Sequence, residues 1–406
     1  MRKFSIALSL LLVILIVSGC YNTGSPSHNN NESASSPSNS SITHDTTVTP
    51  NTEQQIPDIS IENIDTSAVQ GDVNNIYYGN DNNVLILADK LYLYDLVSGQ
   101  ISSEAERDGF SEETYFVINN GFAVVGMSES NGGSNGGLIA TSDTGGMICI
   151  IYDNNLNTVT KIAGNAFIGA DEFVFSTHHI KVSQDGTKIA YASDYGLFVY
   201  DIESDKKTCL VNLLDENEAQ RSGLIIFDDL AFVNGGNMIA FKSQSFDVPA
   251  VIGKPSFDTY GSVNIDGTGL RVNRSTDYSV KEMTAYDSFA LLAEDFTVPS
   301  GRLMIWDVSS DTTRILTLST TKESGDVFGS DEGQYFATAS LNQDNLTVRV
   351  YETNTGAMVF EETITEESSY MSRIPEIRMF DNHRTCLVLL GNRQSDIPTK
   401  TLTFNF

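Results

Sequence analysis

Among the residues that could do chemistry, the stretch GGSNG from Gly132 to Gly136 has the spacing of a nucleophile elbow. In that motif a serine between glycines sits on a strained turn from a buried strand into a helix, which exposes its hydroxyl for attack. Here the neighbours are glycine, serine and asparagine, which predict a loop, and no hydrolase domain follows. We therefore expect no catalytic serine, and the sequence assigns no catalytic residue.

Two adjacent histidines, His178 and His179 in THHIKV, are the next candidates, because imidazole nitrogens bind metals. We place them at the start of an inner β-strand. Successive strand side chains point to opposite faces, so both cannot easily face one metal. One of them could line a channel, but a hydrogen-bonded structural role is favoured. With no Cys-x-x-Cys pair, calcium loop, Walker loop or dinucleotide fingerprint, no metal and no cofactor are expected.

Three of the four cysteines, Cys149, Cys209 and Cys386, lie in apolar runs. Three thiols cannot all pair within one chain, so the sequence encodes no disulfide framework. The apolar surroundings predict buried strand thiols rather than reactive or metal-bound ones.

The fourth cysteine, Cys20, follows a short N-terminal segment with a positive start and an apolar run, FSIALSLLLVILIV. Together with the small residues Ser18 and Gly19, these features define a secretory signal. The run is too short and too close to the terminus for a permanent membrane span. VSGC resembles the lipobox of bacterial lipoproteins, with Val17 where leucine is commoner. The resemblance implies cleavage before Cys20 and a diacylglycerol on its thiol.

Residues 1–19 are thus predicted to be a lipoprotein signal peptide, and residues 20–56 a lipidated cysteine with a disordered linker. The linker consists mostly of Asn, Ser, Thr and Pro, which cannot bury enough apolar surface to offset the cost of ordering. As a flexible coil it would span roughly 35 Å, enough to hold a domain clear of a membrane. We expect the extracytoplasmic face of a bacterial cell membrane, to which several acyl chains would anchor the protein.

The formal net charge is −29, of which residues 1–56 carry −1 and residues 57–406 carry −28. Such a surface repels phosphate backbones, so no nucleic-acid partner is expected. A solvated, soluble surface is the main interpretation. Attraction of cations, basic peptides or a cationic polymer is the functional alternative.

A repeated pattern explains the single tryptophan, Trp306, and the aspartate that follows it. Elsewhere too, an alternating apolar run ends in an aromatic residue and an acid, and a polar turn follows, which predicts strand, turn, strand. Including two weaker members, the markers are Tyr94, Tyr152, Tyr200, Ile265, Trp306, Tyr351 and Phe404. Their spacings scatter around the ~40–50 residues of a four-stranded propeller blade. The aromatic should pack between sheets, and the acid should accept hydrogen bonds from the turn.

Upstream of most markers a second pattern predicts two strands joined by a tight turn, as in IKVSQDGTKIAYAS at 180–193. SQDGTKIAYAS resembles the repeat of TolB-like and peptidase propellers, with Gln184 where proline is usual, and LMIWDV resembles the WD40 signature. These short similarities extend over about residues 57–406 and imply a β-propeller. The chain lacks the α/β domain of TolB, so a role in translocation is not carried over.

The predicted fold class is all-β: a seven-bladed β-propeller of four-stranded antiparallel blades over 57–406, with six or eight blades as alternatives. The last unit supplies three strands, EIRMF, CLVLLG and TLTFNF, and so lacks its outer strand. An unpaired edge is a liability, and ring closure needs a fastener. The segment PDISIENI, Pro57 to Ile64, is predicted to pair with 401–406 and close the ring.

Ligand binding is expected on the face that carries the b–c and d–a connections, because loops on a rigid scaffold usually carry function. Long b–c connections are predicted at 128–146, 244–262, 294–301 and 392–399. The second of these, in blade 4, is the leading candidate, although a lid over blade edges is an equal alternative. Its candidate ligand-binding residues are Phe246, Asp247, Lys254, Phe257, Asp258 and Tyr260.

These features favour a lipid-anchored, extracytoplasmic β-propeller that binds an unknown protein, peptide or glycan as a scaffold, receptor or accessory subunit. An enzyme is the less favoured alternative. It would be a propeller-fold hydrolase or lyase acting on extracellular carbohydrate or peptide, with Asp or Glu at the channel mouth. A third idea is an envelope-assembly partner similar to outer-membrane insertion lipoproteins.

Overall fold

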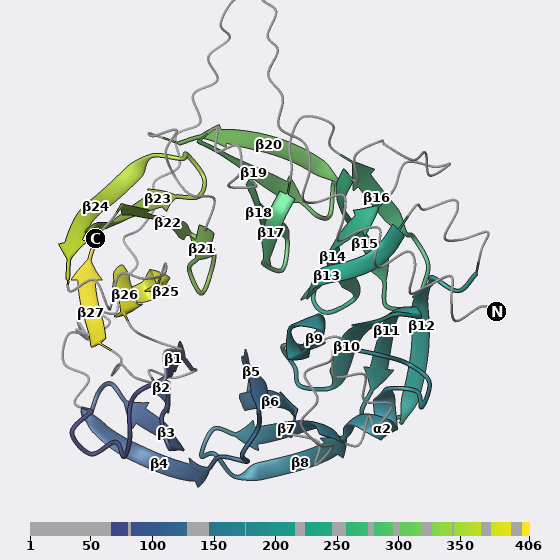
Figure 1. Ribbon diagram of the computed structural model, residues 1–406, viewed down its shortest axis with the longest axis horizontal. Helices are drawn as coiled ribbons and strands as arrows, with labels where there is room; N and C mark the ends of the chain where they lie inside the picture. Colours follow the sequence, from purple (N-terminus) through teal and green to yellow (C-terminus); the bar gives the residue numbers. More distant parts are fainter. Residues whose placement is uncertain are drawn as a thin grey trace, which may run out of the picture. The chain divides into compact units, whose positions relative to one another are not determined.

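The strands form seven sheets around a central opening, in a computed structural model of the chain (Figure 1). Six sheets have four antiparallel strands, and the seventh has three in the part of the chain that the structure describes. The seven-bladed propeller is therefore confirmed. The structure describes residues 66–79, 83–127, 146–174, 176–215, 224–245, 257–274, 280–294, 301–318, 327–342, 345–366, 375–390 and 400–406.

Each blade contains consecutive strands, here called a to d from the centre outward. Blades 1 to 3 comprise β1 (Asn75–Tyr78), β2 (Asn83–Leu87), β3 (Lys90–Asp95), β4 (Gln100–Glu106), β5 (Glu112–Ile118), β6 (Gly121–Met127), β7 (Met147–Asp153), β8 (Thr158–Ala163), β9 (Ile180–Val182), β10 (Lys188–Ser193), β11 (Gly196–Asp201) and β12 (Lys206–Asn212). Blades 4 to 7 comprise β13 (Leu224–Val233), β14 (Met238–Ser245), β15 (Phe257–Asn264), β16 (Arg271–Arg274), β17 (Val280–Ala285), β18 (Phe289–Glu294), β19 (Arg302–Asp307), β20 (Thr312–Thr317), β21 (Val327–Gly329), β22 (Tyr335–Asn342), β23 (Asn345–Glu352), β24 (Met358–Thr365), β25 (Glu376–Phe380), β26 (Thr385–Leu390) and β27 (Lys400–Asn405). The short helical segments are α2 (Gly164–Phe167), η3 (Thr177–His179) and η4 (Asp381–His383).

Burial explains why the strands take this radial order. Strands b and c are buried on both faces, as in β10 and β11, because sheets pack against them on either side. Outer strands such as β4 and β20 are mostly exposed or half-buried. Figure 1 shows these outer strands at the rim, with β1, β5, β9 and β13 beside the opening.

The predicted markers fall on strand c in six of the seven blades. In six blades the marker residue pairs with a residue of strand b, as Trp306 does with Ala290 and Tyr94 with Val84. The weak marker Ile265 is the exception, because β15 ends one residue earlier at Asn264. The repeat therefore located the seven blades correctly along the chain.

Apolar cores join each blade to the next. Between blades 4 and 5, for example, Val233 and Tyr260 pack with Met304 and Trp306. One core joins the last blade to the first, because Phe380, Leu387 and Leu389 belong to the same cluster as Ile76 and Val84. The ring is therefore closed by side-chain packing between blades 7 and 1.

The predicted closing strand, 57–64, lies outside the described residues, so its pairing with 401–406 stays a prediction. Within the described chain β27 pairs with β26. The signal peptide, Cys20 and the linker also lie outside the described residues. No helix among the residues described is both long and apolar enough to cross a membrane.

One expectation about local structure was wrong. Cys209 is exposed, whereas Cys149 and Cys386 are buried as expected. A bulge between Leu197 and Phe198 shifts the register of β12, so that Leu210 and Val211 turn inward and Cys209 outward. In blades 1, 3 and 6, for which no long connection was predicted, strands b and c are joined through two residues each.

Candidate functional site

The structure narrows the loop predicted in blade 4. Strand β14 continues to Ser245 and β15 begins at Phe257, so the connection spans 246–256 rather than 244–262. Three of the six candidate residues, Phe246, Asp247 and Lys254, lie outside the described residues.

The other three candidates belong to β15, where the structure describes the backbone of Phe257 and Asp258 but not their side chains. Tyr260 is 6% exposed, and its ring packs edge-to-face on Trp306 at 5.1 Å between centroids. Tyr260 therefore belongs to the core between blades 4 and 5, which corrects its assignment as a ligand-binding residue. A tyrosine in a long predicted loop could not be recognised as part of a strand from sequence alone.

Trp306 and Asp307 have the structural roles that the repeat predicts. The indole of Trp306 is fully buried and its Nε1 donates to Asp311 Oδ1 at 3.0 Å. Asp307 Oδ1 accepts from the backbone N and the hydroxyl of Ser310 at 2.7 and 2.8 Å. These hydrogen bonds hold the pKa of Asp307 below its usual range. The pair stabilises the blade and its turn.

A cluster of charged side chains lies on the inner part of blades 3 to 5, where the sequence pointed to no site. Its centre is a bulge in β13, in which Asp228 is the extra residue between Phe227 and Asp229. Lys242 Nζ on the neighbouring strand β14 lies 2.9 Å from Asp228 Oδ2. Asp229 Oδ2 accepts from the backbone N of Met283 in blade 5 at 3.1 Å. We call His179, Lys181, Asp228, Asp229, Lys242 and Glu282 the inner-strand cluster.

Burial has shifted the protonation equilibria of this cluster. It raises the pKa of Asp229, although Lys242 and Lys181 favour its charged form. It lowers the pKa of Lys181 on β9, against the opposing attraction of Asp229 and Glu282. Acids and bases with perturbed pKa values and specific charged neighbours are typical of functional sites, although structural ion pairs produce them too.

Both histidines lie in η3 and not in a strand, which corrects the sequence interpretation, and His179 belongs to the inner-strand cluster. Ser176 begins the 3₁₀ turn by accepting from the backbone N of His178. Glu112 of blade 2 fixes the turn, because its Oε1 accepts from Ser176 Oγ, Thr177 N and Thr177 Oγ1 at 2.5, 2.9 and 2.8 Å. Burial lowers the pKa of His179, opposed by the charges of Asp228 and Asp229, so the neutral imidazole is favoured.

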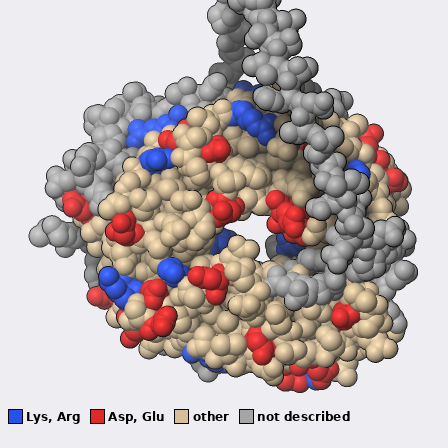
Figure 2. Space-filling model, turned by 180° about the vertical axis from the view of Figure 1, so that it is seen from behind, with Lys and Arg blue, Asp and Glu red and all other residues tan. Residues whose placement is uncertain are grey.

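The cluster includes residues of β9 and β13, two of the strands beside the central opening in Figure 1. Figure 2 shows acidic and basic side chains around this opening, seen from one face of the ring. Within the described residues no three His, Cys, Asp or Glu side chains are arranged to hold a metal ion. A signal for the cluster existed in the sequence, since two consecutive aspartates interrupt the apolar run LIIFDDLAFV. Charges inside a strand pattern indicate a bulge or a polar channel.

The fold and its repeat define this protein as a seven-bladed β-propeller with a WD40-like fold. It is similar to the β-propeller domain of Cps50 (Swd1) from Myceliophteria thermophila, with a TM-score of 0.54, 8% identity, and coverage of 83% of this chain and 98% of that domain. It is also similar to Raptor from Chaetomium thermophilum, with a TM-score of 0.51 and 11% identity over 83% of this chain. The match spans 28% of the Raptor chain.

No protein-family model matches the chain, and no curated protein matches it. At these identities the structural similarities establish the fold alone.

Proposed function

We propose that this protein is a lipid-anchored, extracytoplasmic binding module, which holds its partner on the face of the b–c and d–a connections. The inner-strand cluster carries this proposal, because it places charges of both signs on strands a of three adjacent blades, among them the half-buried Lys181, Asp228 and Asp229. Lys181 and Glu282 are the second and third residues of β9 and β17, so these two charges lie close to the d–a connections of the proposed face. The partner would be a protein, peptide or glycan with complementary polar groups.

The lipid anchor is supported by VSGC, whose resemblance to the lipobox of bacterial lipoproteins implies acylation of Cys20. The TolB-like turn SQDG is compatible with a bacterial extracytoplasmic location. Several acyl chains would bind a membrane firmly, since each buried CH₂ contributes about 0.8 kcal/mol. The linker would then hold the propeller clear of the surface.

Replacing Cys20 with alanine is expected to abolish both lipid labelling and membrane association. Cells fed an alkyne-bearing fatty acid should show a labelled wild-type band in the membrane fraction and none for Cys20→Ala. The control is Cys209→Ala, which removes the exposed thiol of β12 and should keep the label. A label that persists in Cys20→Ala, or that disappears in Cys209→Ala alone, would contradict the proposed anchor.

Replacing Lys181 with methionine is expected to reduce partner capture roughly tenfold, because a half-buried charge that meets a partner is worth more than 1.4 kcal/mol. Methionine keeps most of the length of the side chain and removes the ammonium group, including its contact over the ring of Phe116 at 5.7 Å. Capture would be measured by photo-crosslinking on intact cells and quantitative mass spectrometry of the crosslinked species. Lys206→Met, on the exposed outer strand of the same blade, is the matched control.

Equal capture by Lys181→Met and Lys206→Met would remove the inner-strand cluster from the binding face. Replacement of 246–256 by a Gly/Ser segment of equal length then tests the blade-4 connection separately. Release of a cleaved peptide or sugar fragment by the wild type, in place of stable capture, would favour the hydrolase or lyase alternative.

A further inference from the structure

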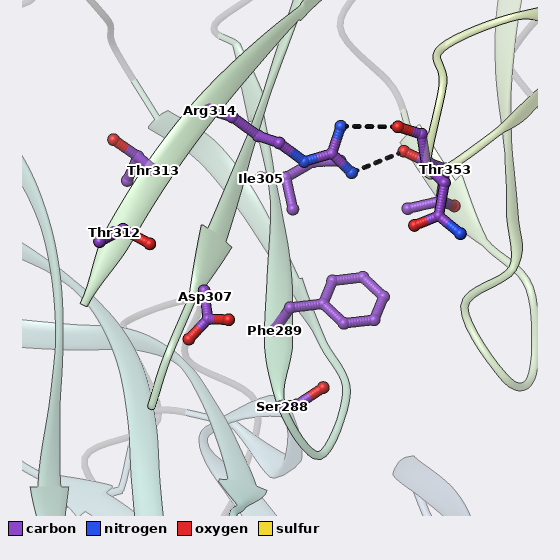
Figure 3. Close-up of a pocket in the computed structure, with 9 residues that line it drawn as sticks. Ser288, Phe289, Ile305, Asp307, Thr312, Thr313, Arg314 and Thr353 are labelled. Atoms are coloured by element: carbon purple, nitrogen blue, oxygen red, sulfur yellow. Dashed lines mark hydrogen bonds between the residues drawn. The ribbon is translucent and has the colours of Figure 1, made fainter. Parts of the chain in front are cut away.

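A pocket of about 310 Å³ lies between blades 5 and 6, on the face of the a–b and c–d turns. This volume is at the lower end of the roughly 300–1,000 Å³ range of small-ligand pockets. Strands β18, β19 and β20 supply one side, and the turn between β23 and β24 supplies the other (Figure 3). The pocket is separate from the inner-strand cluster, on which the proposed function rests.

The inner wall of the pocket is apolar. Phe289 is half-buried, and its ring is stacked on Tyr286 with 4.8 Å between centroids, which fixes its orientation. Ile305 of β19 is 5% exposed and lies on the same side. A fixed aromatic ring beside an aliphatic side chain favours a ligand that presents a flat face of C–H groups.

The pocket contains one positive and one negative side chain, Arg314 and Asp307, and both form hydrogen bonds within the protein. Arg314 crosses from blade 5 to blade 6 and donates from Nη1 to Asn354 O at 2.9 Å and from Nη2 to Thr353 O at 3.0 Å (Figure 3). Asp307, which also lines the pocket, accepts from Ser310. An anion would compete with two carbonyls for Arg314 and would face Asp307, whereas a cation would face Arg314. The pocket therefore favours an uncharged ligand.

One polar atom of the pocket lacks a hydrogen-bond partner. Thr353 is 4% exposed, and its Oγ1 makes no hydrogen bond to the protein in the described chain. A buried hydroxyl without a partner costs free energy, which a ligand hydroxyl recovers because it both donates and accepts. The side chains of Ser288, Thr312 and Asn354 add further donors and acceptors at the exposed edge.

We propose that this pocket binds a single uncharged sugar unit, with the C–H face of the ring on Phe289 and a hydroxyl on Thr353 Oγ1. The apolar wall, the cancelled charges and the buried hydroxyl each fit a neutral polyhydroxylated ring. A pocket this small holds one terminal or free sugar rather than a polymer segment. The site is open to the face opposite the proposed partner.

Saturation-transfer NMR and calorimetry on the full chain in detergent would test this site. The probes are methyl β-glucoside, methyl β-galactoside and N-acetylglucosamine, with glucuronate and glucosamine as charged counterparts. We expect at least one neutral sugar to bind with a Kd of about 1 mM, as is reasonable for a ligand of this size. Thr353→Val, which removes only the hydroxyl, should weaken this binding roughly three- to tenfold.

Thr317→Val, on the same strand as Arg314 but outside the pocket, is the matched control and should bind like the wild type. Circular dichroism would confirm that both variants fold. Absence of binding by every neutral sugar at about ten times the expected Kd would overturn the proposal. So would binding that Thr353→Val leaves unchanged, or tighter binding of either charged sugar.

Discussion

Replacing Trp306 with alanine is expected to lower the free energy of unfolding by about 3–5 kcal/mol, the usual cost of truncating a large buried aromatic. The indole is fully buried between blades 4 and 5, where it packs on Tyr260 and anchors the c–d turn through Asp311. Alanine removes both contacts and leaves a cavity that neighbouring strands cannot fill. Urea denaturation followed by far-ultraviolet circular dichroism measures the change.

Trp306→Phe separates the two contributions of the indole. Phenylalanine keeps a ring against Tyr260 but loses the hydrogen bond to Asp311, so we expect a smaller loss of about 1–2 kcal/mol. Tyr200 offers a comparison, because its hydroxyl donates to Asp205 at 2.8 Å in the same position of blade 3. If Trp306→Ala were no less stable than Trp306→Phe, the ring would not contribute to the joint between blades.

Replacing Asp381 with alanine is expected to cost about 1–3 kcal/mol, because two backbone donors of the neighbouring blade lose their acceptor. Asp381 is 5% exposed, and its Oδ2 accepts from the backbone N of Glu332 and of Gln334 at 2.8 and 3.1 Å. Asp381→Asn keeps an acceptor oxygen there and removes a negative charge beside Asp331 and Glu332. The asparagine variant should therefore be at least as stable as the wild type at pH 7.

The pH dependence of Asp381→Asn follows from the raised pKa values of this pair. Burial raises the pKa of Asp381, and burial together with the charge of Asp381 raises that of Asp331 to about 6. Just above pH 4 the folded protein therefore binds more protons than the unfolded chain does. The free energy of unfolding consequently falls as the pH rises toward 6. Asp381→Asn removes one of these two carboxyl groups, so its free energy of unfolding should fall less with rising pH. Urea denaturation should therefore show that its stability relative to the wild type increases from pH 4.5 to pH 7.

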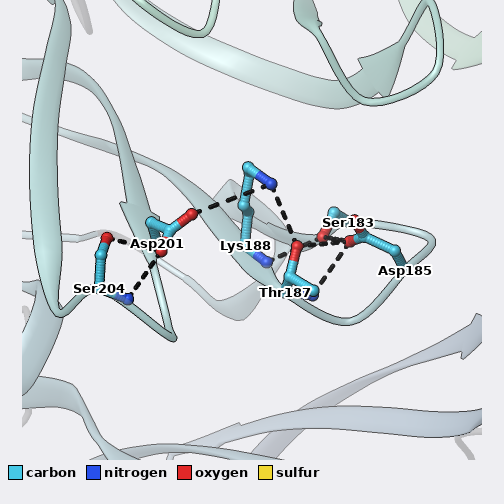
Figure 4. Close-up of polar contacts among 6 residues, drawn as sticks. All are labelled: Ser183, Asp185, Thr187, Lys188, Asp201 and Ser204. Carbon is cyan, nitrogen blue, oxygen red and sulfur yellow. Dashed lines mark hydrogen bonds and ion pairs between the residues drawn. The ribbon is translucent and has the colours of Figure 1, made fainter.

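Asp185 gives a control with the opposite sign. Burial opposes its charge, but hydrogen bonds from Ser183 and Thr187 to its Oδ1 lower its pKa (Figure 4). The stability from a lowered carboxyl pKa is present above the ordinary pKa and is lost as the pH falls. Asp185→Asn should therefore be less stable than the wild type at pH 7, with the difference shrinking toward acid. The same pH trend in both variants would contradict the assignment.

The fold was predictable because local patterns repeat in every blade. Six of the seven markers lie on strand c, and the Asp-Gly turn in SQDG is the turn between β9 and β10. Asp185 accepts from the backbone N of Thr187 at 3.0 Å, as the turn interpretation requires. Turn chemistry and alternating apolar residues act within a few positions, so one sequence reveals them.

The inner-strand cluster was not predictable, because it depends on contacts between blades. Asp229 and Met283 are far apart in the sequence, and the bulge at Asp228 that brings the charges together belongs to one strand alone. Tyr260 was misplaced for a different reason. The sequence predicted a loop at 244–262 because this stretch is polar, but β15 already begins at Phe257. The register of the strands and their packing against other blades determine where these side chains lie. The spacing of residues along the chain reveals neither.

The core between Phe380 and Ile76 has a consequence for the resistance of this protein to proteolysis. In an open row of repeats the terminal unit has one neighbour, so it frays first and exposes cleavage sites. A closed ring has no terminal blade, and releasing any blade breaks two cores at once. A single cut in a connection therefore leaves both fragments clamped in place, and proteolysis must await the unfolding of a much larger part of the ring.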